Sequence, residues 1–234
     1  MTSLTRLPPR ARVITQFIAD CAREGNIPYF LGGANALNAR GIIDRATIDV
    51  DFYIPPHHIP VLKKIVEPKL NEFLNEGFLL KGKTLEEKAQ QTKCRIFKAV
   101  SDVPGENMKA DVSENRSVLL PSAFTDFHGI NVASVPLMVT GKISAISNKG
   151  RPSQSKVVTK TQIDLTDLVE MLDYLIEKGE IVPDELQSLL RWQAPPFTWK
   201  AFWAGVERVP QRARPINLEE MLRMVNIKKV TSLL

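Results

Sequence analysis

The sequence predicts an α/β (α+β) fold. Helices flank a mixed β-sheet, and a helical C-terminal region follows. Residues 29–54 read as a strand, a glycine turn, a short helix and a second strand. Residues 92–112 hold two alternating segments around a turn at 103–106, which predicts an antiparallel strand pair. Beyond residue 160 the apolar residues follow helical spacing. We therefore expect two domains, over residues 1–150 and 151–234.

The composition is that of an ordinary globular protein. The chain has 234 residues, of which 44% are hydrophobic and 24% are charged, and it is long enough to bury a sizeable core. No apolar run approaches the roughly 18 residues that span a bilayer, and the first residues lack the apolar core of a secretory signal. We expect a cytoplasmic protein with no membrane partner.

The charge balance favours an anionic partner. The chain has 31 Lys and Arg residues against 26 Asp and Glu residues, a formal net charge of +5, and nucleotides, RNA and DNA all suit it. Cys21 and Cys94 lie in unrelated segments, which argues against a disulfide framework and a cysteine zinc site. The adjacent His57 and His58 have only one other histidine to join them, so we interpret them as a surface loop.

The remaining elements follow from apolar spacing and from the residues that interrupt it. Helices are expected over residues 10–24, 60–75, 136–147, 161–178, 183–192, 198–206 and 218–225. Pro68 is expected to kink or split the second of them. The polar stretch 81–91 reads as a loop or frayed helix, and residues 128–135 read as a further strand.

The glycine pair after the first strand predicts an anion site. Gly32 and Gly33 allow a tight turn whose backbone can approach a ligand without a Cβ atom in the way. The short helix that follows, residues 34–39, would direct its unpaired N–H groups and its positive dipole end toward the same place. A phosphate group fits this arrangement.

Two carboxylates follow in the next strand. Asp49 and Asp51 are two residues apart in an apolar segment, so their side chains share a face. Like charges this close repel each other, and a divalent cation is a natural way to hold them together; oxygen ligands suggest Mg²⁺ or Mn²⁺. The alternative is that both acids mark the solvated face of an edge strand.

These residues resemble a known family. Residues 31–33 (LGG) and 45–51 (RATIDVD) match the pattern of the nucleotidyltransferase superfamily of DNA polymerase beta, and most closely its AbiEii toxin-like branch. The resemblance implies a nucleotidyltransferase-like fold, a catalytic domain over residues 1–150, and nucleotide binding by Gly32, Gly33, Arg45 and Thr47. It also implies that Asp49 and Asp51 bind metal. Ala34 departs from the pattern, which often has a hydroxyl residue there.

A third acid is expected on a later strand. Asp111 lies between apolar residues in a predicted strand, so it is either at an edge or converges on something charged. The resemblance implies that it joins Asp49 and Asp51 as a metal ligand and catalytic residue. Glu114, near the end of that strand, is the alternative.

The resemblance extends to a lysine in a later helix. Residues 142–145 (KISA), a loop cation (Arg151, Lys156 or Lys160) and residues 164–167 (DLTD) follow the order seen in toxin-like members. This implies that Lys142 contacts the triphosphate. The alternative is that Lys142 is one exposed charge on an amphipathic helix. Trp199 and Trp203, further on, have the spacing of core residues, which we favour over base stacking.

The expected activity is transfer of a nucleoside monophosphate from an NTP to a hydroxyl acceptor. An RNA acceptor such as tRNA suits the basic charge, and a protein or a small hydroxylated molecule remains an alternative. Two rival interpretations are a catalytically silent module that binds nucleotide or RNA, and a metal-dependent phosphohydrolase that uses the same acids. The sequence does not identify a protein partner.

Overall fold

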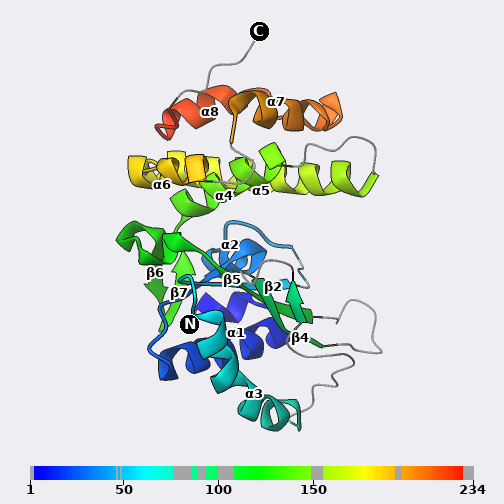
Figure 1. Ribbon diagram of the computed structural model, residues 1–234. Helices are drawn as coiled ribbons and strands as arrows, with labels where there is room; N and C mark the ends of the chain where they lie inside the picture. The colour runs from blue at the N-terminus through cyan, green and yellow to red at the C-terminus, as the bar shows by residue number, and fades with distance from the viewer. Residues whose placement is uncertain are drawn as a thin grey trace. The chain divides into compact units, whose positions relative to one another are not determined.

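The computed structural model describes residues 3–45, 47, 49–75, 86–88, 93–99, 108–148, 155–192 and 197–228. They form two compact units, Met1–Ala133 and Ser134–Leu234, and each unit is described by itself. The first carries every described strand and the second is helical (Figure 1). Whether catalytic function divides at residue 150 stays a prediction. The expected turn at 103–106, Arg151 and the side chain of Lys156 lie outside the described residues.

The first unit is built on a mixed seven-stranded sheet with the order β3-β4-β5-β2-β1-β7-β6. Strand β2 pairs in parallel with β5 and antiparallel with β1, while β1 pairs in parallel with β7. The strands are β1 (Phe30–Gly32), β2 (Asp49–Ile54), β3 (Glu86–Lys88), β4 (Lys93–Ala99), β5 (Met108–Glu114), β6 (Phe124–Phe127) and β7 (Ile130–Ala133). The predicted fold class, a mixed sheet flanked by helices, is therefore confirmed.

Helices cover this sheet. The long helices α1 and α3 pack against each other, and both contact β5 (Figure 1). Short 3-10 segments complete the unit, whose helical elements are η1 (Ser3–Arg6), α1 (Pro9–Glu24), α2 (Gly33–Arg40), α3 (Ile59–Asn75), η2 (Arg116–Leu119) and η3 (Pro121–Ala123). Pro68 lies inside α3 without ending it, so the expected split is wrong, and a kink at this residue stays a prediction. Among the described residues, no helix is long and apolar enough to cross a membrane.

Three short strands differ from the expectation. The segment that reads as a loop at 81–91 contains β3, which pairs with β4 through its backbone despite its charged side chains. The strand expected at 128–135 begins only at Ile130, because His128 and Gly129 adopt positive φ values of 57° and 83° and form the turn of a hairpin. Strand β6, on the other side of that turn, was not predicted.

The second unit is a helical assembly. Helix α4 packs against α5 and α7, and α5 packs against α8. Its elements are α4 (Val135–Asn148), α5 (Ser155–Lys178), α6 (Asp184–Ser188), η4 (Leu189–Trp192), α7 (Trp199–Glu207), η5 (Gln211–Ala213) and α8 (Leu218–Met224). The rings of Trp199 and Trp203 lie 5.4 and 5.1 Å from the ring of the fully buried Phe202. Both tryptophans pack against the core but are only half-buried, so the preference over base stacking stays a prediction.

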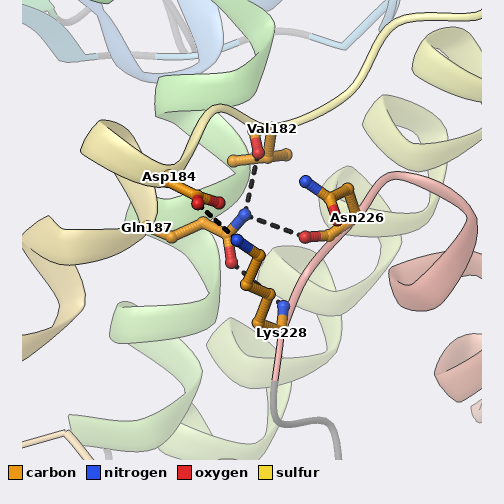
Figure 2. Close-up of polar contacts among 5 residues, drawn as sticks. All are labelled: Val182, Asp184, Gln187, Asn226 and Lys228. Carbon is orange, nitrogen blue, oxygen red and sulfur yellow. Dashed lines mark hydrogen bonds and ion pairs between the residues drawn. The ribbon is translucent and has the colours of Figure 1, made fainter.

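A polar cluster ties the segment after α8 to α6 (Figure 2). The Gln187 side-chain amide donates to the carbonyl oxygens of Val182 and Asn226, both at 2.8 Å. Its own oxygen accepts from the backbone N–H of Lys228 at 3.0 Å, and the Lys228 ammonium pairs with Asp184. These contacts satisfy backbone groups that no helix or strand supplies with partners.

The close approach of α7 to α4 predicts that a small residue is needed at Gly205. A Cβ atom there would lie 2.6 Å from the carbonyl oxygen of Ile146. We expect Gly205→Ala to lower the free energy of unfolding by about 1–3 kcal/mol in a denaturant titration. Gly141→Ala is the matched control, because a Cβ at this helical position meets nothing within 4 Å. The control should be neutral or stabilising by about 0.5–1 kcal/mol, and equal effects of the two changes would contradict the packing argument.

Candidate active site

Three neighbouring strands bring the glycine turn and two of the acids to one place. Gly32, the last residue of β1, is the register partner of Asp51 on β2. On its other side, Asp51 is the register partner of Asp111 on β5. Because register partners in paired strands point to the same face, the carboxylates of Asp51 and Asp111 lie on one side of the sheet.

The alternation of β2 explains why its acids face away from the core. Val50, Phe52 and Ile54 are all 0% exposed, whereas Asp49 and Asp51 are only partly buried. Side chains alternate along a strand, so the apolar residues fix the acids on the opposite face. Asp111, in contrast, is 6% exposed, which makes it the most buried of the three acids.

The glycine turn lies directly against Asp51. Gly33 has a φ of +62°, and a Cβ atom at this position would collide with the Asp51 carboxylate. Helix α2 begins at Gly33, and no side chain caps its N-terminus. The start of α2 and the Asp51 carboxylate are therefore close together, and an anion bound by the N–H groups of this turn stays a prediction.

Two buried asparagines of α2 hold the acidic strand in position, and sequence analysis missed both. Asn35 donates its amide to the carbonyl oxygen of Asp49 at 2.7 Å, and Asn38 donates to the carbonyl oxygen of Arg45 at 2.9 Å. Asn35 is 0% exposed and Asn38 is 5% exposed. The available signal was their spacing, because residues three apart share one face of a helix that is otherwise mainly alanine and leucine.

The segment before β2 carries two of the predicted nucleotide-binding residues. The Thr47 hydroxyl lies 3.3 Å from the backbone N–H of Asp49, which donates to it. Arg45 is half-buried, and its backbone is joined to Asn38 through both its N–H and its carbonyl group. These contacts place Arg45 and Thr47 at the start of the strand that bears the acids.

A lysine that sequence analysis did not select also belongs to this group. The ammonium of Lys109 lies 2.7 Å from Oδ1 of Asp49, its register partner on β2. This Oδ1 atom is buried and accepts no hydrogen bond of good geometry from the described residues, so the contact is an ion pair rather than an aligned hydrogen bond. The signal was the position of Lys109, two residues before Asp111 on a strand.

Tyr53 borders the site on the same face of β2. Its ring stacks on Phe30 with centroids 5.1 Å apart, and a Cβ on Gly32 would collide with it. Burial, followed by the negative charges of Asp51 and Asp111, raises the pKa of the Tyr53 hydroxyl. The phenol therefore stays neutral at physiological pH, and its ring closes one side of the glycine turn.

Lys142 is found in the second unit, where it is neither exposed nor unpaired. Its ammonium lies 2.8 Å from Asp164 and 2.6 Å from Asp167 across the α4–α5 contact. The side chains of Lys142, Asp164 and Asp167 are 16%, 10% and 2% exposed. The alternative of a solvated surface charge is therefore wrong, and the nucleotide contact stays a prediction.

The acids suit a divalent cation by their chemistry but do not form a complete cluster. Carboxylate oxygens are the ligands that Mg²⁺ and Mn²⁺ prefer, and the buried, poorly satisfied Oδ1 of Asp49 adds a donor near Asp51 and Asp111. In the part of the chain that the structure describes, no three His, Cys, Asp or Glu residues are already arranged around one metal position.

A mixed sheet in which a glycine turn lies against a carboxylate of the neighbouring strand, with a further acid on the strand after it, is typical of the nucleotidyltransferase-like α/β class. A family model described as "Nucleotidyl transferase AbiEii toxin, Type IV TA system" matches residues 17–230. The chain therefore belongs to the AbiEii nucleotidyltransferase family, and the resemblance inferred from its two motifs is confirmed. A search of curated proteins found no significant sequence match.

One of three similar solved structures supports this fold. JHP933 from Helicobacter pylori is 17% identical with a TM-score of 0.50, over 94% of this chain and 90% of that one. The antibiotic-resistance factor ANT(2'')-Ia is 18% identical with a TM-score of 0.40, over 71% and 88% of the two chains. The Megavirus polyadenylate synthase is 18% identical with a TM-score of 0.45, over 70% and 31%. At these scores the last two add nothing to the fold assignment.

The contact between Gly33 and Asp51 predicts a specific cost of substitution. Gly33→Ala should lower the free energy of unfolding by about 1–3 kcal/mol more than Gly129→Ala, measured by denaturant titration. Both glycines have positive φ values, so both substitutions share the backbone penalty of about 1–2 kcal/mol. Only the Cβ at position 33 meets a neighbour, since nothing lies within 4 Å of one at position 129. Equal costs would show that the Asp51 contact is absent.

The buried charges around Lys142 predict a structural role for this lysine. Lys142→Met should lower the free energy of unfolding by about 3–5 kcal/mol, because Asp164 and Asp167 would lose the cation between them. Lys178→Met removes the same charge from an exposed pair with Glu177, and this control should cost about 0–1 kcal/mol. Thermal or urea unfolding distinguishes the two, and a Lys142 variant as stable as the control would contradict the ion-pair arrangement.

Proposed function

We propose that this protein is a metal-dependent nucleotidyltransferase that moves a nucleoside monophosphate from an NTP to a hydroxyl acceptor. The observation that carries the proposal is the register at the centre of the sheet, where Asp51 lies between Gly32 and Asp111. Membership of the AbiEii family supports transfer of this kind. The proposed catalytic residues are Asp49, Asp51 and Asp111.

In this proposal the triphosphate lies over the glycine turn. The Tyr53 ring and the Asp51 carboxylate occupy the places that side chains at Gly32 and Gly33 would take, so only the backbone of the turn is offered to the phosphates. The uncapped N–H groups at the start of α2 are donors suited to an anion. Arg45 and Thr47 precede β2, where they are joined to Asn38 of α2 and to Asp49, and they are proposed as further nucleotide contacts. Lys142 is proposed as a phosphate contact on the resemblance of its motif alone.

The proposed metal ligands are Asp49, Asp51 and Asp111, with Mg²⁺ or Mn²⁺ as the cation. The three acids fit such an ion because two of them lie opposite each other on adjacent strands. The third presents a buried oxygen that is paired with the Lys109 ammonium but accepts no aligned hydrogen bond. Divalent ions, when bound at such a site, neutralise charge on the phosphates and on the departing pyrophosphate.

The proposed reaction takes place on the face of β2 and β5 that carries the acids. The acceptor oxygen forms a bond to the α-phosphorus, the bond from that phosphorus to the bridging oxygen breaks, and pyrophosphate leaves. Asp111, the most buried acid, takes the proton of the attacking hydroxyl. Tyr53, neutral and packed over Gly32, excludes water from one side of the turn.

We favour RNA, and tRNA in particular, as the acceptor, because the formal net charge of +5 suits a polyanion. A protein or a small hydroxylated molecule is the alternative acceptor. The family description names a toxin of a type IV toxin–antitoxin system, so we also propose that the transfer inhibits growth when the protein is produced without a protective partner.

Removing either acid of β2 should abolish transfer without unfolding the protein. Asp49→Asn and Asp51→Asn keep the shape of the side chain but remove its charge, and each should lower the rate by at least about 100-fold. The assay incubates protein with each α-labelled NTP, Mg²⁺ or Mn²⁺ and total RNA, and then resolves RNA and protein separately. Asp126→Asn, at an exposed acid of the β6–β7 hairpin, is the matched control and should retain activity.

The pattern of label separates the competing functions. Label on RNA or protein that is lost in both β2 variants supports transfer and identifies the acceptor class. Release of phosphate without any adduct would replace the proposal with a phosphohydrolase. Nucleotide binding with no turnover in any mixture would favour a silent binding module.

A further inference from the structure

Lys109 gives the acidic face a cation of its own. Strands β2 and β5 run in parallel with Asp49 opposite Lys109 and Asp51 opposite Asp111, so the described side chains of these two strands place three carboxylates and one ammonium group on one face. Strand β4 adds the backbone positions of Arg95, opposite Asp111, and Lys98, opposite Lys109. The ammonium lies 2.7 Å from Asp49 Oδ1. The lysine therefore binds an oxygen that the proposed function assigns to a divalent cation.

The ion pair is suited to exchange. The side chains of Lys109 and Asp49 are 28% and 40% exposed, and ion pairs at such exposure contribute little to folding stability. A divalent ion bound by the same carboxylate would repel the ammonium, because both are cations. Oδ1 of Asp49 accepts no aligned hydrogen bond that would hold the present geometry.

Resting on the proposed function, we propose that Lys109 is a positioning residue that couples metal binding to nucleotide binding. Without nucleotide, its ammonium neutralises Asp49 and competes with the metal for Oδ1. When the metal arrives together with an NTP, the ammonium leaves Asp49 and pairs with a phosphate oxygen. Lysine is a suitable group for this step, since its flexible stem and compact charge bind phosphates without a fixed orientation.

The coupling makes binding of the metal alone weak and binding of the metal–NTP complex strong. Displacing Lys109 costs free energy in the first case, because the ammonium loses its only described carboxylate partner. In the second case the triphosphate replaces that partner. Lys109 thus weakens binding of the metal alone and strengthens binding of the metal–NTP complex.

The test measures binding rather than turnover. Mn²⁺ affinity of the full chain is determined by calorimetry, first alone and then as preformed complexes with the α,β-methylene analogues of the four ribonucleoside triphosphates. Lys109→Met removes the charge and keeps the length of the side chain. We expect the variant to bind Mn²⁺ alone at least about 5-fold more tightly and the best metal–nucleotide complex about 10-fold more weakly.

Controls separate this effect from a general loss of charge or of structure. Lys69→Met removes a lysine that pairs with Glu24 outside the site, and it should leave both affinities unchanged. Lys109→Arg should restore much of the wild-type behaviour. Disruption of the sheet would lower the affinity for Mn²⁺ and for the metal–nucleotide complex together. Tighter Mn²⁺ binding by Lys109→Met therefore cannot result from unfolding.

Two results would overturn the inference in distinguishable ways. If Asp49→Asn and Asp51→Asn lose Mn²⁺ binding while Lys109→Met behaves like Lys69→Met, the proposed metal site stands and the role of Lys109 is wrong. If wild-type protein binds neither Mn²⁺ nor any of the complexes, or binds them independently of Asp49 and Asp51, the proposed function fails and the role of Lys109 fails with it.

Discussion

The structure depends on the pairing register of β2. This strand is hydrogen-bonded on both sides, to β1 and to β5, and one of its faces supplies three fully buried apolar residues. A slip of one residue would turn Asp49 and Asp51 into the core and expose Val50 and Phe52. The same register places Gly32 and Asp111 on either side of Asp51. The same register is therefore required both to bury the core and to assemble the candidate site.

That constraint concentrates negative charge on one face of the sheet. Asp51 and Asp111 occupy directly opposed positions, which is unfavourable for two like charges. The surrounding chain limits the cost by pairing Asp49 with Lys109 and by fixing the backbone of the acidic strand through Asn35 and Asn38. An arrangement that opposes folding locally but is supported by neighbouring groups is typical of a functional site.

In the second unit, a partly buried lysine neutralises the buried acids. Its buried acids, Asp164 and Asp167, share the ammonium of Lys142, and two tryptophan rings of α7 contact the buried ring of Phe202. Close approach of α7 to α4 requires a glycine at position 205. These contacts explain the helical fold of this unit without reference to a ligand.

The sequence by itself determined the fold class, the glycine turn, the acids of β2 and the AbiEii family, because these depend on short-range patterns. Alternation placed Asp49 and Asp51 on one face, and glycine is required where φ is positive beside a carboxylate. Only the tertiary structure decided which residues meet across the chain. Lys109 pairs with an acid 60 positions earlier, Asn35 and Asn38 support a strand through backbone carbonyls, and Lys142 has two partners on the next helix. Strand β3 likewise exists because β4 supplies a partner backbone, which its charged sequence does not reveal. Such pairings depend on the register and packing of distant elements, and local propensity predicts neither.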